Sequence, residues 1–179
     1  MDPRAIAQTC RLVLIAISAV AIPAGAQSPI KDQTSPQDTH VRGFWVDPST
    51  GLMWGGKDNG KDVSWRGAMK YCRGLRLDGH SDWRLANMAE LQGVYDKTVE
   101  APGLAGYAKH LRAFTWHVKG NLFLTGDTWS SNYRTDDRGR NSGYSWYFDF
   151  NDGRSSNQPS GFPYSSSGMR ALCVRGPGQ

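Results

Sequence analysis

The clearest hydrophobic pattern in the chain lies between Ser64 and Gly74. Apolar side chains recur there at i, i+3, i+4 and i+7, which is one face of an α-helix; they are Trp65, Ala68, Met69 and Cys72. Ser64 stands at the expected N-cap, because its hydroxyl can accept a hydrogen bond from a free backbone N–H. Gly74 suits a helix end. The pattern predicts a helix here, with Cys72 on its buried face.

A second, shorter helix is predicted soon after the first. Residues 83–85, Trp-Arg-Leu, favour a short strand, and Asn87 follows with Glu90 three residues on. This spacing is a capping-box-like start with asparagine in place of serine or threonine. The apolar face of the predicted helix then continues as Leu91, Val94 and Tyr95.

Most of the remaining chain is predicted as short strands. Residues 144–150 alternate between a face of aromatic side chains and a second face that carries Ser145, Tyr147 and Asp149, which is typical of a β-strand. Of Tyr133, Tyr147 and Tyr164, we expect Tyr147 to be the most exposed, because it shares a strand face with Ser145 and Asp149. Further strands are expected at residues 44–46, 52–54, 121–125, 128–131 and 169–175.

Polar stretches with glycine and proline predict loops. Long surface loops are expected over residues 132–143 and 154–168, and residues 98–120 favour loop with a helical turn at 108–114. A strand pair, two helices and then several antiparallel strands define an α+β fold rather than an alternating β-α-β one.

The first 26 residues have the pattern of a secretory signal peptide. Arg4 and Arg11 precede an apolar run at 12–21, and Ala24-Gly25-Ala26 supplies the small residues that signal peptidase requires. An uncleaved anchor is the alternative, although the run is short for a membrane span. Residues 27–42 are polar and predict a disordered lead-in, which leaves a domain at 43–176 and no membrane span after cleavage.

Two cysteines remain after the predicted cleavage, Cys72 and Cys173. A pair of cysteines in an exported protein suggests a disulfide, and two separate buried thiols are the alternative. The net charge of the whole chain is +5. A modest positive charge favours anionic partners only weakly, and nothing in the sequence indicates nucleic-acid binding.

Five short motifs occur in order along the chain. They are TGLMW at 50–54, WRGAMKYC at 65–72, WRL at 83–85 with Glu90 and Leu91, Gly126 with WSS at 129–131, and RALCVR at 170–175. Together, with both cysteines in place, they resemble the Lcl C-terminal-type domain, a bacterial family named for the end domain of a collagen-like adhesin.

The resemblance implies a C-type-lectin-like fold with a disulfide from the first helix to the last strand. It also implies an exported binding module, and the founding adhesin is associated with sulfated glycosaminoglycans. This chain differs from the family at Ala86, where proline commonly follows Trp-Arg-Leu. It also has no collagen-like Gly-X-Y repeat, so support for trimeric adhesion is lost.

Arginines in the predicted loops are the candidate ligand-binding residues. Guanidinium groups bind sulfate or carboxylate through paired hydrogen bonds, and Tyr133, Tyr147 or Tyr164 could stack on a sugar ring. The candidate set is Arg134, Arg138, Arg140, Tyr147 and Arg154. The alternative for the arginines is ordinary solvated charge, partly neutralised by Asp136 and Asp137.

A calcium site has weak support. Asp149, Asn151 and Asp152 could supply a few oxygen ligands, but Ca²⁺ takes six to eight, and a hairpin turn explains the same residues. Gln158-Pro159 is followed by Ser160, which lacks the oxygen ligand that sugar-binding C-type lectins have at that position. We therefore predict neither a metal nor another cofactor.

No enzymatic pattern stands out in the sequence. The four histidines, His40, His80, His110 and His117, lack a metal-ligand spacing, and a disulfide-bonded Cys72 would be no nucleophile. We expect an exported, non-catalytic module, periplasmic or extracellular. Its loops at 132–143 and 154–168 are predicted to bind carbohydrate, such as an anionic glycan, or another cell-surface ligand. The alternative is a structural module that contacts another envelope protein.

Overall fold

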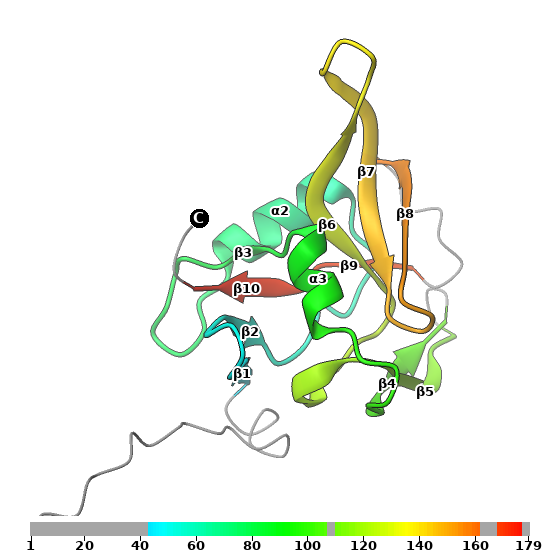
Figure 1. The fold of residues 1–179 in the computed structure, drawn as a ribbon. Coiled ribbons are helices and arrows are strands. Elements are labelled where there is room, and N and C mark those ends of the chain that lie inside the picture. The colour runs from blue at the N-terminus through cyan, green and yellow to red at the C-terminus, as the bar shows by residue number, and fades with distance from the viewer. Residues whose placement is uncertain (1–42, 107–109, 162–167, 177–179) are drawn as a thin grey trace, which may run out of the picture. The chain divides into compact units, whose positions relative to one another are not determined.

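The computed structural model describes residues 43–106, 110–161 and 168–176. The predicted signal peptide and lead-in, as well as Tyr164, lie outside these residues. Two α-helices and three β-sheets occur in the described part (Figure 1), which confirms the α+β class. None of the described helices is long and apolar enough to cross a membrane.

The elements follow one another along the chain as β1 (Phe44–Val46), β2 (Met53–Gly55), α2 (Trp65–Gly74), β3 (Arg84–Leu85), α3 (Met88–Val94), β4 (Ala101–Ala105), β5 (Arg112–Trp116), the 3-10 turn η1 (Lys119–Asn121), β6 (Asp127–Thr135), β7 (Asn141–Asp149), β8 (Arg154–Pro159), β9 (Met169–Arg170) and β10 (Cys173–Arg175).

Both helices form where the sequence predicts them, because their first turns are capped locally. The Ser64 hydroxyl accepts a hydrogen bond from the Gly67 N–H at the start of α2. At the start of α3, Asn87 Oδ1 accepts from the Glu90 N–H at 2.9 Å, and Glu90 Oε2 accepts from the Asn87 N–H at 2.8 Å. The capping box satisfies two backbone donors that the helix leaves free, so this prediction is confirmed.

The first sheet has the strand order β1-β2-β10-β3, with β10 antiparallel to both of its neighbours. The last described strand therefore lies inside the sheet rather than at its edge (Figure 1). The prediction of a single strand at 169–175 is wrong in one respect. Ala171 and Leu172 divide this segment into β9 and β10, and β9 pairs with β6 in another sheet.

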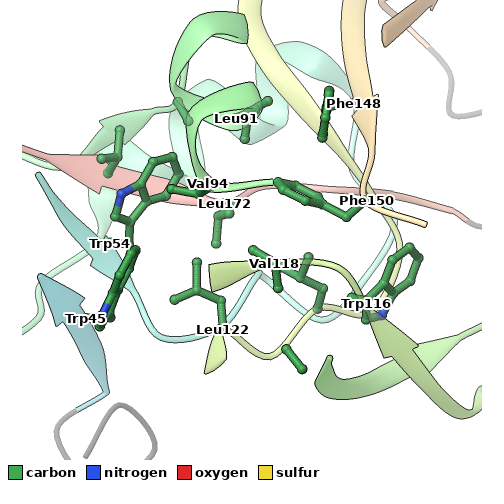
Figure 2. Packing of buried hydrophobic residues seen from close by; sticks show 14 residues of the cluster. Trp45, Trp54, Leu91, Val94, Trp116, Val118, Leu122, Phe148, Phe150 and Leu172 are labelled. Atoms are coloured by element: carbon green, nitrogen blue, oxygen red, sulfur yellow. The ribbon is translucent and has the colours of Figure 1, made fainter. Parts of the chain in front are cut away.

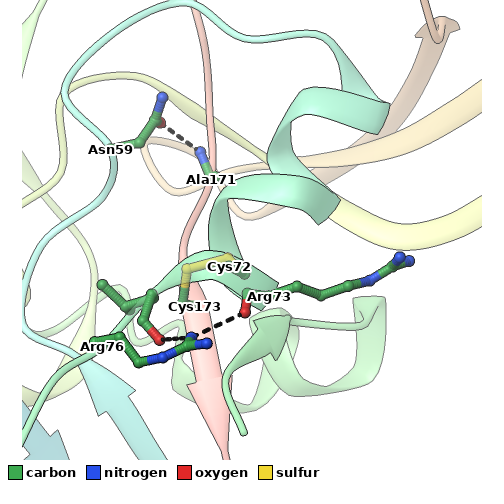
Figure 3. Close-up of a disulfide and its surroundings, with 7 residues drawn as sticks. Asn59, Cys72, Arg73, Arg76, Ala171 and Cys173 are labelled. Atoms are coloured by element: carbon green, nitrogen blue, oxygen red, sulfur yellow. Dashed lines mark hydrogen bonds between the residues drawn. A yellow bond between two sulfur atoms is a disulfide. The ribbon is translucent and has the colours of Figure 1, made fainter. Parts of the chain in front are cut away.

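A disulfide joins Cys72 on α2 to Cys173 on β10, 101 residues later in the chain (Figure 3). Both cysteines are buried within a cluster that includes Phe44, Trp83 and Trp129. The predicted pairing is confirmed. It fixes α2 against the first sheet.

The third sheet, with the order β8-β7-β6-β9, corrects two predicted loops. Residues 132–135 and 141–143 belong to β6 and β7, and only 136–140 form the turn between them. Residues 154–159 form β8, which pairs with β7 from Asp149–Arg154 to Tyr144–Pro159. These segments are polar on both faces, so no apolar alternation marks them.

The expectation of loop over residues 98–120 is also wrong in part. Strands β4 and β5 form a two-stranded hairpin there, with Ala101 opposite Trp116. The helical turn predicted at 108–114 is wrong over Arg112–Phe114, and residues 108 and 109 lie outside the described part. At 121–125, η1 and irregular chain replace the predicted strand, because Asn121 closes the 3-10 turn and Phe123 makes only an isolated bridge with Lys57.

Tryptophans form much of the core (Figure 2). Trp45, Trp54, Trp83 and Trp129 are buried. Trp65, which lies on the predicted apolar face of the first helix, is only half-buried. The largest cluster packs α3 and β10 onto Trp116, Phe148 and Phe150.

One guanidinium is buried beside Thr125 and Asp58, which are also buried, and pairs with the more exposed Asp62. Arg170 is 1% exposed; its Nε donates to Thr125 Oγ1 at 2.7 Å, and its Nη1 lies 2.5 Å from Asp62 Oδ1. Asp58 accepts hydrogen bonds from the Thr125 and Gly60 N–H groups. Burial raises the pKa of Asp58, although these hydrogen bonds and the Arg170 charge counteract it. The network holds the loop between β2 and α2 against β9.

Candidate functional site

A groove of about 700 Å³ separates the start of α3 from the third sheet. We call it the α3–β7 groove. Its helix side is formed by Asn87, Met88, Ala89 and Gln92. Its sheet side is formed by Asn132, Tyr133, Trp146 and Ser155.

Hydrogen bonds between β6 and the start of α3 fix the two walls of this groove. The Ser131 N–H donates to the Ala86 carbonyl at 2.7 Å. One residue further on, Asn132 Oδ1 accepts from the Met88 N–H at 2.8 Å and from Ser130 Oγ. The walls are therefore held in place by the fold itself, as expected of a preformed site.

Two aromatic side chains are presented to the groove. Tyr133 on β6 is 46% exposed, and its ring meets the edge of Trp65 on α2 with the centroids 6.2 Å apart. Trp65 is itself held by a hydrogen bond from its Nε1 to the Ser130 carbonyl. Trp146 on β7 is half-buried. The rings are thus held at a surface that a ligand can reach.

Amide and hydroxyl groups complete the lining. Gln92 Nε2 donates to Ser155 Oγ, which in turn donates to Met88 Sδ. Asn87 and Asn132 each use the side-chain oxygen to accept a backbone hydrogen bond, and their Nδ2 groups have no partner among the described residues. Such amides can donate to a ligand oxygen.

A second hollow of about 320 Å³, here the Trp54 pocket, lies beside the groove and shares Asn87 and Ala89 with it. Its wall also includes Asp47, Trp54, Arg84, Glu90 and Gly93. Arg84 donates two hydrogen bonds to Glu90, Nη1 to Oε2 at 2.8 Å and Nη2 to Oε1 at 2.6 Å. The charged groups of Arg84 and Glu90 in the pocket wall are thus paired with each other.

The Arg84–Glu90 pair makes the stability of the domain depend on pH in the acid range. Burial alone would raise the pKa of Glu90, but hydrogen bonds from Arg84 and from the Asn87 N–H outweigh it and lower the pKa. Stability is therefore expected to fall as the pH drops through the depressed folded pKa. Urea denaturation from pH 7 to pH 3 should show that the free energy of unfolding falls less on acidification in Glu90→Gln than in the parent domain. An equal fall in both proteins would contradict this account.

The predicted arginine set does not form one site. Arg134, Arg138 and Arg140 lie on the distal half of the β6–β7 hairpin, which extends away from the helices (Figure 1). Arg154 lies opposite Asp149, at the other end of the nine-residue β7 and so roughly 25 Å away along the strand. The four arginines therefore do not lie in one compact pocket.

Carboxylates neutralise two of these arginines. Arg140 pairs with Asp136 at 2.9 Å, and Arg154 pairs with Asp152. The Arg140 and Arg154 side chains are 68% and 82% exposed, so these are solvated surface pairs of little energetic weight. The interpretation of these two as solvated charge fits the geometry better than a role in anion binding.

The prediction that Tyr147 is more exposed than Tyr133 is wrong, because Tyr133 is 46% exposed. Tyr147 is half-buried and packs against Trp129, with the ring centroids 6.4 Å apart, whereas Tyr144 is 41% exposed. Ser145, on the same predicted outer face, is buried. The face that alternation assigned to solvent covers the disulfide cluster instead.

The candidate calcium ligands lie at the turn between β7 and β8. Asp149 Oδ1 accepts from the Asn151 N–H at 2.7 Å, and Asp152 is engaged by Arg154. In the residues described here, no group of three or more His, Cys, Asp or Glu side chains is placed to hold a metal ion. The three residues thus act in a turn.

Trp146 is the functional candidate that sequence reasoning missed. It alternates with Phe148 and Phe150, which are buried, so the pattern assigned it to the core face. Tyr133 was noted as a sugar-stacking residue but was placed in a loop. No short-range signal brings Tyr133, Trp146 and Asn87 together.

The fold and groove define a disulfide-linked α+β domain with an aromatic surface groove. Residues 43–175 match the model of the Lcl C-terminal domain family. Because this match covers most of the chain, the protein belongs to that family. A search of curated proteins finds no match.

Proposed function

We propose that this domain is an exported, non-catalytic, C-type-lectin-like module that binds carbohydrate in the α3–β7 groove. The observation that carries the proposal is the placement of Tyr133 and Trp146 beside unpaired amide groups in one groove. A sugar ring has apolar C–H faces and a rim of hydroxyls. Aromatic rings supply contact area for the faces, and amides pair with the rim.

The disulfide supports export, since such bonds persist in oxidising compartments such as the periplasm or the extracellular space. The groove lining supports binding rather than catalysis. Its described residues supply amides, the hydroxyls of Ser155 and Tyr133, a thioether and aromatic rings, and they include no carboxylate, imidazole or amine for general acid–base work.

Trp146→Ala is expected to weaken glycan binding at least tenfold while the domain stays folded. Truncating an aromatic anchor in a binding site costs about 2 kcal/mol or more, and Trp146 is half-buried, so its loss leaves the main core intact. The measurement is affinity for glycans selected on an array with the purified domain, with thermal unfolding as the check on folding.

Tyr71→Ala is the matched control, because Tyr71 is 36% exposed on α2 and does not line the groove. A second comparison uses Arg134→Ala, Arg138→Ala and Arg140→Ala together. If binding survives Trp146→Ala and is lost in the triple variant, the hairpin is the ligand site and the groove is not.

A protein-interaction role is the second candidate. The observation in its favour is the exposed distal hairpin, where Arg134, Arg138 and Tyr144 are all open to solvent. Capture of one envelope protein that is lost on hairpin substitution, together with no glycan binding, would favour this role.

A further inference from the structure

We infer that the ligand is a neutral oligosaccharide of at least two rings, which lies in the α3–β7 groove and continues over α3 into the Trp54 pocket. This inference rests on the proposed function and adds the class and length of the ligand. The two hollows adjoin: Asn87 and Ala89 line both of them. Ala89 is exposed and presents only a methyl group, so it forms a low rim between them.

Charge in the two hollows favours an uncharged ligand. None of the described residues that line the α3–β7 groove is charged. The Trp54 pocket has one guanidinium, Arg84, against two carboxylates, Asp47 and Glu90. A sulfated or carboxylated sugar would enter a pocket of net negative charge, and like charges there oppose binding.

The Arg84 guanidinium is already committed. Its two terminal nitrogens donate to Glu90, and Glu90 also accepts from the Asn87 N–H. An anionic ligand would have to break this pair to reach the guanidinium. A neutral hydroxyl can instead share hydrogen bonds at the rim without displacing either partner.

The Trp54 pocket has features of a second sugar subsite. Its wall combines the half-buried apolar side chain of Leu52 with the polar groups of Arg84 and Asn87, whereas Trp54 is fully buried and offers a ligand no accessible donor. Thr50 adds a hydroxyl at the same wall.

Gly93 gives direct experimental access to this second subsite. It lines the Trp54 pocket but not the groove, and nothing lies within 4 Å of an added Cβ. Leucine and alanine both favour a helix over glycine. Gly93→Leu therefore adds a bulky side chain at the pocket wall with no clash at its Cβ, and Gly93→Ala is a matched control that adds one methyl group.

The test uses calorimetry with one-, two- and three-ring members of the glucose, galactose and N-acetylglucosamine series, and a heparin hexasaccharide as the anionic probe. In the parent domain, affinity should rise at least tenfold from one ring to three and should change little between low and high salt. Gly93→Leu should abolish this gain with chain length, whereas Gly93→Ala should retain it.

The outcomes separate the inference from the proposed function. If neutral glycans bind equally at every length and Gly93→Leu has no effect, carbohydrate binding stands and the two-subsite inference fails. If only heparin binds, in a salt-sensitive manner, the neutral class is wrong. If neither the neutral glycans nor heparin bind the parent domain, the proposed function itself fails.

Discussion

Replacing Arg170 with methionine is expected to destabilise the domain by about 3 kcal/mol, the lower end of the cost of removing one partner of a buried ion pair, because the Asp62 side chain is 29% exposed. Arg170 is 1% exposed, and its loss leaves Thr125 Oγ1 without its donor and the Asp58 and Asp62 carboxylates without their cation. Methionine keeps much of the apolar volume, so the effect reports charge and hydrogen bonding rather than a cavity. Urea denaturation at pH 7 measures it.

Arg175→Met is the matched control. Arg175 pairs with Asp82, whose side chain is 58% exposed, so this change should cost about 1 kcal/mol or less. A loss of stability in Arg170→Met no greater than in this control would contradict the account.

The pH dependence of the Arg170→Met effect has a definite sign. Burial raises the folded pKa of Asp58 above its unfolded value and the Arg170 charge counteracts this, so the variant raises that pKa further. Ionised Asp58 therefore destabilises the variant most at neutral pH, and protonation relieves the cost as the pH falls through the raised folded pKa. The stability difference from the parent domain should narrow on acidification.

Removing the disulfide by Cys72→Ala and Cys173→Ala together is expected to lower the free energy of unfolding by about 4 kcal/mol. The two cysteines are 101 residues apart, so the bond closes a long loop. Such a crosslink restricts the conformations of the unfolded chain. Alanine avoids placing an unpaired hydroxyl in the buried cluster. Denaturation with and without a reducing agent measures the effect.

Two internal comparisons support this measurement. The reduced parent domain should unfold near the midpoint of the double variant, and the variant should not respond to reductant. A parent domain whose stability is the same in both conditions would show that the crosslink contributes nothing.

Local chemistry explains what could be predicted from the sequence. The caps at Ser64 and Asn87 depend on side chains within three residues of the backbone groups they satisfy. The apolar face that carries Cys72 has a helical period within one segment. These features are encoded over short distances, so the helices and the buried cysteine could be located in advance.

The sheet partners and the groove depend on contacts between distant segments. Strand β8 contains Ser155, Ser156 and Asn157, and only its pairing with β7 makes it a strand. Along β7 the environment changes: Phe148 packs in the core, whereas Trp146 lines the sheet side of the groove. A period-two pattern assigns both to one face and cannot distinguish their surroundings.

The central position of β10 has a consequence for the order of folding. Until residues 173–175 have been made, the strand that pairs with both β2 and β3 is missing, and Cys72 on α2 has no cysteine to pair with in this sheet. A chain made from its N-terminus therefore holds open strand edges until this late segment arrives, and such edges invite pairing with other chains. The first sheet and the crosslink can thus be completed only after residues 173–175 have been made.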